Sequence, residues 1–148
     1  MSERPEFRDL LAFLNQDVET ALPTSHETIR TWVFDVYYAE KARIQQAVQS
    51  ALSKVHFTVD LWTSTNHLAL LGIIAHYLAE DGQLQQSVLA LKELEGQHTG
   101  ENQALIIIFI IEEFGIASKI GYFMMDNAVN NDSMIKALSA CKLLTYYQ

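Results

Sequence analysis

The sequence has little cysteine and no excess of basic residues, and both shortages limit the classes of protein to which it can belong. A single cysteine, Cys141, in 148 residues excludes an internal disulfide framework and any zinc finger built on several cysteines. One cysteine is also typical of a reducing compartment. Lysine and arginine number 10 against 18 aspartates and glutamates, which gives a net charge of −8. A free-standing DNA-binding domain normally carries a basic excess, because much of its affinity comes from neutralising phosphates.

Long apolar runs are also missing. The longest uninterrupted one, Ala104–Ile111, is far shorter than the roughly 20 residues that a membrane-spanning helix needs. The N-terminus has no charged start followed by an apolar segment, so no secretory signal is expected. An apolar content of 49% suits one globular domain or part of a larger one. The sequence therefore predicts an intracellular protein with no membrane partner.

The first 53 residues predict helices. Apolar residues between Phe7 and Leu14 have the spacing of a short amphipathic helix, which ends before Pro23. Thr24 begins a capping-box pattern, with Glu27 three residues later. One long helix from about residue 25 to 53 is expected, since apolar residues recur there at helical spacing: Ile29, Val33, Val36, Tyr37, Ile44, Val48 and Leu52.

Aromatic residues on this long helix allow two interpretations. Trp32, Tyr37 and Tyr38 could form a surface on which nucleic-acid bases stack. Aromatic residues at helical spacing are more often part of a hydrophobic core. We therefore expect these three side chains to be buried.

Three strands should follow the helix. The first, within residues 55–64, carries Asp60. The second, Leu68–Leu78, is almost continuously apolar, which predicts a strand covered on both faces. Asp81 and Gly82 suit a tight hairpin turn. The alternating polarity of Gln83–Leu91 then predicts a half-buried strand near a sheet edge.

The second half of the chain predicts a helix, a strand and a further helix. The run 104–111 is rich in β-branched residues, which favours a strand. Its full length and the stop at Gly115 favour a helix over about 101–114, which would have to be buried on more than one side. A fourth strand at about 120–125 precedes a helix with four apolar positions: Met134, Ile135, Leu138 and Cys141.

Two aspartates occupy matching places at strand ends. Asp60 lies near the end of the first strand, and Asp126 directly follows the fourth. Two strands that each deliver an aspartate at the C-terminal end are a common way to build a divalent-metal site, because hard cations prefer carboxylate oxygens. Asp126 alone, ahead of a helix, would more simply be a helix cap. The pair favours a metal site.

Three sequence blocks, in order, resemble the hAT superfamily of cut-and-paste DNA transposases, which includes BED zinc-finger proteins. Phe57–Ser64 contains a D-x-W-T-S pattern, His98–Asn102 a histidine-threonine-glycine link, and Met125–Asn131 a D-N-A-x-N-N pattern. The resemblance runs from about Phe7 to about Leu144. The family's common N-terminal zinc finger is missing from this sequence, as its single cysteine requires.

The resemblance implies an α/β protein with a partial ribonuclease-H-like fold (β-β-β-α-β-α), preceded by an α-helical N-terminal segment. Residues 1–53 would be the helical segment, which serves DNA binding and assembly in the family. Residues 54–148 would be the N-terminal half of the catalytic domain. In that fold the first and fourth strands are parallel neighbours, which would bring Asp60 and Asp126 together.

The resemblance also implies a chemistry. Asp60 and Asp126 match the first two of three acids that hold two Mg²⁺ or Mn²⁺ ions during DNA cleavage and strand transfer at transposon ends, in the nucleus. The third acid, a glutamate, lies far downstream in the family, whereas this chain ends at Gln148. We therefore expect the chain alone to be inactive. His98 could be a metal ligand or act on DNA, although a loop histidine more often makes local hydrogen bonds.

One alternative and one further expectation remain. The alternative is a non-enzymatic, domesticated or relic protein whose N-terminal helices bind a partner. The further expectation is self-association. Apolar surface on the fourth strand and on the helix at 101–114 would stay uncovered in this chain.

Overall fold

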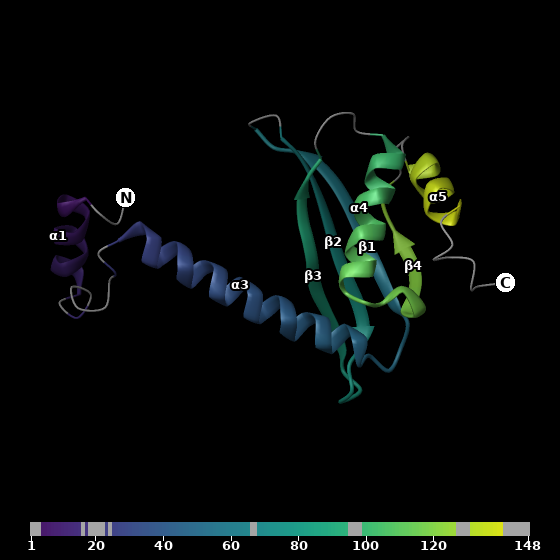
Figure 1. Cartoon of the computed structure of the whole chain (residues 1–148), viewed down its shortest axis with the longest axis horizontal. Coiled ribbons are helices and arrows are strands. Elements are labelled where there is room, and N and C mark those ends of the chain that lie inside the picture. The colour runs from purple at the N-terminus through teal and green to yellow at the C-terminus, as the bar shows by residue number, and fades with distance from the viewer. Residues whose placement is uncertain are drawn as a thin grey trace. The chain divides into compact units, whose positions relative to one another are not determined.

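A computed structural model describes residues 4–15, 17, 23, 25–65, 68–94, 99–126 and 131–140 (Figure 1). The chain divides into two compact units, residues 1–42 and 43–148. The boundary predicted from the sequence lies after residue 53, whereas this division falls within the helix α3 (His26–Gln49). No helix among the described residues is both long and apolar enough to cross a membrane.

The elements follow the expected order. They are α1 (Pro5–Leu14), α3 (His26–Gln49), β1 (Val55–Thr63), β2 (Ala69–Leu78), β3 (Leu84–Glu93), α4 (Gly100–Glu113), the short 3₁₀ helix η1 (Ala117–Lys119), β4 (Ile120–Met124) and α5 (Asn131–Ala140). The predicted α/β class and the order β-β-β-α-β-α after N-terminal helices are confirmed.

Unit 1–42 buries none of its described residues. The Arg8 guanidinium donates a hydrogen bond to the Pro23 carbonyl oxygen at 3.0 Å. Ser25 caps α3, because its Oγ accepts the Glu27 backbone N–H at 3.2 Å. Thr24, the expected cap, lies outside the described residues.

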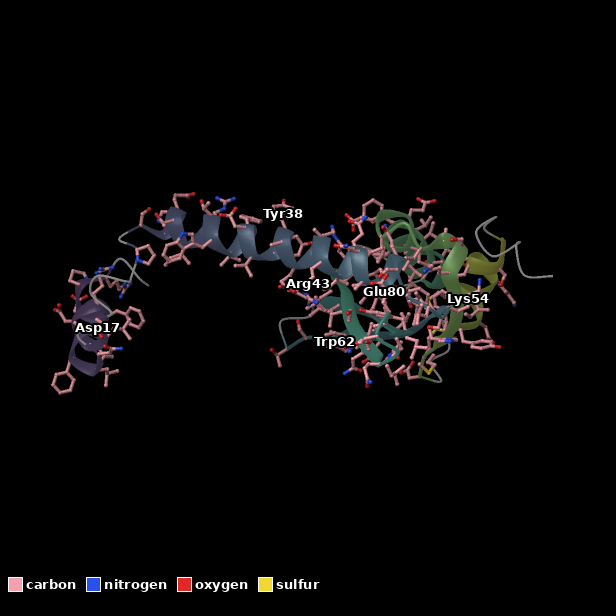
Figure 2. All side chains as sticks on the ribbon, turned by 90° about the horizontal axis from the view of Figure 1, so that it is seen from below. Asp17, Tyr38, Arg43, Lys54, Trp62 and Glu80 are labelled. Carbon is pink, nitrogen blue, oxygen red and sulfur yellow. The ribbon has the colours of Figure 1, made fainter. Side chains whose placement is uncertain are left out.

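The expected burial of the α3 aromatic residues is wrong. Trp32, Tyr37 and Tyr38 are 50%, 52% and 62% exposed, and Figure 2 shows Tyr38 pointing away from the helix. Among the described residues of unit 1–42, α1 is the one helix besides α3, and α1 has no buried residue of its own. The described part of this unit therefore has too little apolar material to enclose these rings.

Helix α3 was expected to reach residue 53 but ends at Gln49. Beyond it, the Leu52 N–H donates to the Leu78 carbonyl oxygen at 2.8 Å. The Ser53 Oγ accepts the Leu78 N–H at 2.9 Å. These bonds to the end of β2 draw the backbone out of the helix and deliver it into β1.

The end of α3 also holds the end of α4. The side-chain amides of Gln45 and Gln49 donate to the carbonyl oxygens of Glu113 and Phe114, at 3.0 and 2.7 Å. Gly115 follows with a φ of 66°, the left-handed conformation that commonly ends helices. The predicted stop at Gly115 is confirmed.

The four strands form one sheet in the order β3-β2-β1-β4. β2 is antiparallel to both of its neighbours, and β4 is parallel to β1. Asp81 and Gly82 form the turn between β2 and β3, where Gly82 has a φ of 79° and its N–H donates to the Ala79 carbonyl oxygen. The predictions of a hairpin, of β3 at an edge, and of parallel first and fourth strands are confirmed.

Helices α4 and α5 lie over the same side of the sheet (Figure 1). They form a core with one side of each strand and the last turns of α3: Val48, Phe57, Leu71, Ile73, Ile107, Ile110, Ile111, Phe114, Met134 and Leu138. We call the other side of the sheet the open face. It carries Thr58, Asp60 and Trp62 of β1 and Met124 of β4, which alternate with the core residues.

Two burial predictions are wrong because the core covers only one side of the sheet. β2 alternates between buried and half-buried residues, so it is not enclosed on both sides. α4 buries one side only, and Leu105 and Phe109 on its other side are exposed. In α5, Met134 and Leu138 are buried, Ile135 is exposed, and Cys141 lies outside the described residues.

Candidate metal centre

Asp60 lies in β1, one of the two strands with neighbours on both sides in the described sheet. Its carboxylate is on the open face and exposed, because the residues on either side of it, Val59 and Leu61, pack into or against the core. The position opposite Asp60 on β2 is Gly72. The surrounding sheet therefore fixes the backbone of Asp60 while leaving its side chain accessible.

Asp126 lies two residues beyond the end of β4 and is exposed. Thr58 of β1 pairs with Met124 of β4, so two further residues on each segment lead to Asp60 and Asp126. The alternation of β4 continues past its end: Phe123 and Met125 pack against the core, whereas Tyr122, Met124 and Asp126 are exposed. The last pair of this register is Thr58 with Met124, and Asp126 follows two residues beyond it, exposed like Met124.

Trp62 flanks the same position. A Cβ atom added to Gly72 would lie 3.0 Å from the Trp62 Cζ3 atom, so the indole lies over the glycine. Gly72 is also the β2 partner of Asp60. The Trp62 indole therefore lies next to the Asp60 position, in the space that Gly72 leaves open on β2.

The donor set consists of two carboxylates. Carboxylate oxygens suit Mg²⁺ and Mn²⁺ better than softer metals. In the part of the chain that the structure describes, no group of three or more histidine, cysteine, aspartate or glutamate side chains is placed to hold a metal. Two carboxylates alone are fewer ligands than such an ion takes. His98 and residues 127–130 lie outside the described residues.

Two histidines on the same face of the sheet as Asp60 were not predicted as site residues. His56 and His76 are paired across β1 and β2 on the open face. His76 Nε2 lies 2.9 Å from the Thr58 hydroxyl, and His56 Nδ1 accepts the Tyr122 backbone N–H at 3.0 Å. Each of these nitrogens adds one contact between neighbouring strands. The available signal was the period-2 spacing of His56, Thr58 and Asp60, which puts them on one face of a strand.

Comparison with known proteins shows the family to which the chain belongs. The family model of the ZBED1 RNase-like domain matches residues 58–145, more than half of the chain. The chain belongs to this family. The resemblance to hAT-type transposases is thereby confirmed, together with the ribonuclease-like fold. No solved structure matches the chain.

Curated relatives are longer and distantly similar. A Zea mays protein named as an AC transposase is 27% identical over 108 residues, which are 73% of this chain and 13% of the relative. The transcriptional regulator tpeD of Talaromyces stipitatus is 27% identical over 138 residues, 93% of this chain and 16% of the relative. The BED zinc-finger protein DAYSLEEPER of Arabidopsis thaliana is 24% identical over 98 residues, 66% of this chain and 14% of the relative. This chain thus spans a small part of each.

Proposed function

We propose that the chain supplies the first two metal-binding acids of a hAT-type DNA transposase domain, with Asp60 and Asp126 as ligands of Mg²⁺ or Mn²⁺. The β1–β4 register supports this proposal, because the pairing of Thr58 with Met124, extended by two residues, would bring both aspartates to neighbouring positions on one exposed face. Membership in the ribonuclease-like family and the similarity to a protein named as a transposase support it. When bound, the metal would activate the attacking water or 3′-hydroxyl and stabilise the leaving oxygen.

The proposed partner is DNA at transposon ends, and the proposed place of action is the nucleus. A net charge of −8 opposes the approach of a phosphate backbone. Cations held by Asp60 and Asp126 would reverse the local charge where the phosphate has to lie. DNA binding at this face should therefore require the metal.

Metal binding is the direct test. We expect the protein to bind Mn²⁺, and the Asp60→Asn, Asp126→Asn double variant to bind it about tenfold more weakly or worse, because Asn keeps the shape of the side chain but removes a charged oxygen ligand. Free Mn²⁺ would be measured by electron paramagnetic resonance during a titration. Asp81→Asn, in the β2–β3 turn, is the matched control and should bind as the unmodified protein does. Equal binding by all three proteins would refute the proposal.

We further expect the 148-residue chain to leave DNA uncut, even with Mg²⁺ or Mn²⁺. A two-ion site needs more ligands than the two carboxylates that Asp60 and Asp126 offer. The assay is incubation with supercoiled plasmid beside the double variant, scored as nicked circles. Metal-dependent nicking that the double variant loses would overturn this expectation.

A second candidate function is non-enzymatic binding of a protein partner through α3. One observation favours it: the middle of α3 exposes six large apolar side chains, namely Trp32, Val33, Phe34, Val36, Tyr37 and Tyr38. Exposed apolar patches often mark interaction sites. Partner binding that survives the double Asp variant and fails after Trp32→Ala would support this function over the first.

A further inference from the structure

The parallel pairing of β1 with β4 is irregular at one point. Val55 pairs with Ile120, but Phe57 pairs with Phe123, so two steps along β1 correspond to three along β4. His56 therefore faces two residues, Gly121 and Tyr122. This is a β-bulge, which is rare between parallel strands.

Core packing requires this bulge. Ile120 is buried, and three residues later the Phe123 ring stacks on Phe57, with 5.0 Å between ring centroids. In a regular strand, residues three apart point to opposite sides. The extra residue returns Phe123 to the core side, so that Ile120 and Phe123 of β4 both face the core.

His56 occupies the bulge. Its Nδ1 accepts the Tyr122 backbone N–H at 3.0 Å, in place of a carbonyl on the neighbouring strand. Its ring also stacks on the Tyr122 ring, with centroids 5.3 Å apart and planes inclined by 12°. Gly121 makes room for the imidazole, because a Cβ atom there would lie 2.6 Å from His56 Nδ1.

The bulge determines which residue of β4, or of the segment that follows it, lies opposite Asp60. Counted without it, the pairing of Val55 with Ile120 would set Asp60 beside Met125. Asp126 would then share a side with Leu61, which packs against the core. A shift of one residue moves every following side chain to the other face.

We propose that His56 is a positioning residue, which stabilises the bulge at Gly121 and Tyr122 and thereby brings Asp126 beside Asp60 on the open face. Its importance for metal binding rests on the proposed function. Its control of the strand register does not. The two claims can therefore be tested separately.

Disulfide trapping measures the register without a metal. With Cys141 replaced by Ser, one protein carries Asp60→Cys and Asp126→Cys, and a second carries Asp60→Cys and Met125→Cys. Neighbouring strands lie about 4.8 Å apart, a Cα separation that a disulfide can span when both side chains share a face. We expect oxidation to cross-link the first pair and to leave the second unlinked.

Substitutions at His56 then test its role. His56→Asn keeps an acceptor at the position of Nδ1 and should keep the cross-linking pattern. His56→Leu has no acceptor, and we expect the ratio of 60–126 to 60–125 cross-links to fall about fivefold, the worth of one typical hydrogen bond. Gly121→Ala should cause a similar fall, since its Cβ displaces the ring. Circular dichroism would establish that each variant is folded.

The outcomes are distinct. An unchanged ratio in both folded His56→Leu and folded Gly121→Ala would overturn the proposal. If His56→Leu fails to fold, an equal ratio in His56→Asn and His56→Gln would overturn it, because Gln places its acceptor one bond too far. If folded His56→Leu binds Mn²⁺ as tightly as the unmodified protein does, the claim that the bulge matters for metal binding is refuted. Cross-links as expected without Mn²⁺ binding by the unmodified protein would refute the proposed function alone.

Discussion

Replacing Phe57 by Ala is expected to remove about 3–5 kcal/mol from the free energy of unfolding. Phe57 is fully buried on the core side of β1, where it stacks on Phe123. The variant would leave a cavity between the sheet and its helices, at the strand that also carries Asp60. Small domains are stable by only about 5–15 kcal/mol, so a large share of the molecules would be unfolded at mild temperature. Urea unfolding followed by circular dichroism measures the change.

Phe109→Ala is the matched control for this experiment. It removes the same side chain from the exposed side of α4, where Phe109 is 54% exposed. At protein concentrations too low for association between copies, we expect a change within about 0.5 kcal/mol, as is usual for surface positions. Similar losses in both variants under these conditions would contradict the one-sided core.

The elements themselves were predictable because their signals are local. Asp81 and Gly82 satisfy the dihedral demands of a hairpin turn, and Gly115 satisfies those of a helix end. The alternating polarity of β3 identified an edge strand. The parallel pairing of β1 and β4, which joins segments far apart in the sequence, followed from the family resemblance.

Burial was harder to predict, because it depends on what packs against a segment. Trp32 and Tyr37 have helical spacing but belong to a unit with no buried described residue. The apolar run in α4 suggested burial on several sides, yet Leu105 and Phe109 are exposed. Periodicity shows that a helix forms and leaves open how many neighbours it has.

At the candidate site, the sequence suggested the two aspartates as ligands but gave no account of the register between β1 and β4. The bulge depends on the His56 side chain and on the space over Gly121. Secondary-structure propensities do not describe such a contact between two strands. One signal was available. Ile120 and Phe123 are apolar at a spacing of three with a glycine between them, and a glycine inside a strand often marks a bulge.

The second large effect concerns association. We expect the chain to self-associate in solution, because β4 forms an edge of the described sheet and carries Tyr122 and Met124, both exposed. Leu105 and Phe109 add apolar surface on α4. Open edges beside apolar side chains favour pairing with another copy. Sedimentation velocity over a range of protein concentrations should show species larger than a monomer.

Two lysines should reverse this association. Met124→Lys with Phe109→Lys removes one apolar side chain from β4 and one from α4 and adds positive charge beside the edge, the usual protection of exposed edges. At about 1.5–3 kcal/mol per buried side chain, association should weaken about a hundredfold or more. Trp32→Lys with Val36→Lys adds the same charge on α3 and should leave association unchanged. A monomeric unmodified chain would refute the expectation, and dissociation by the α3 pair alone would assign the contact to the exposed middle of α3.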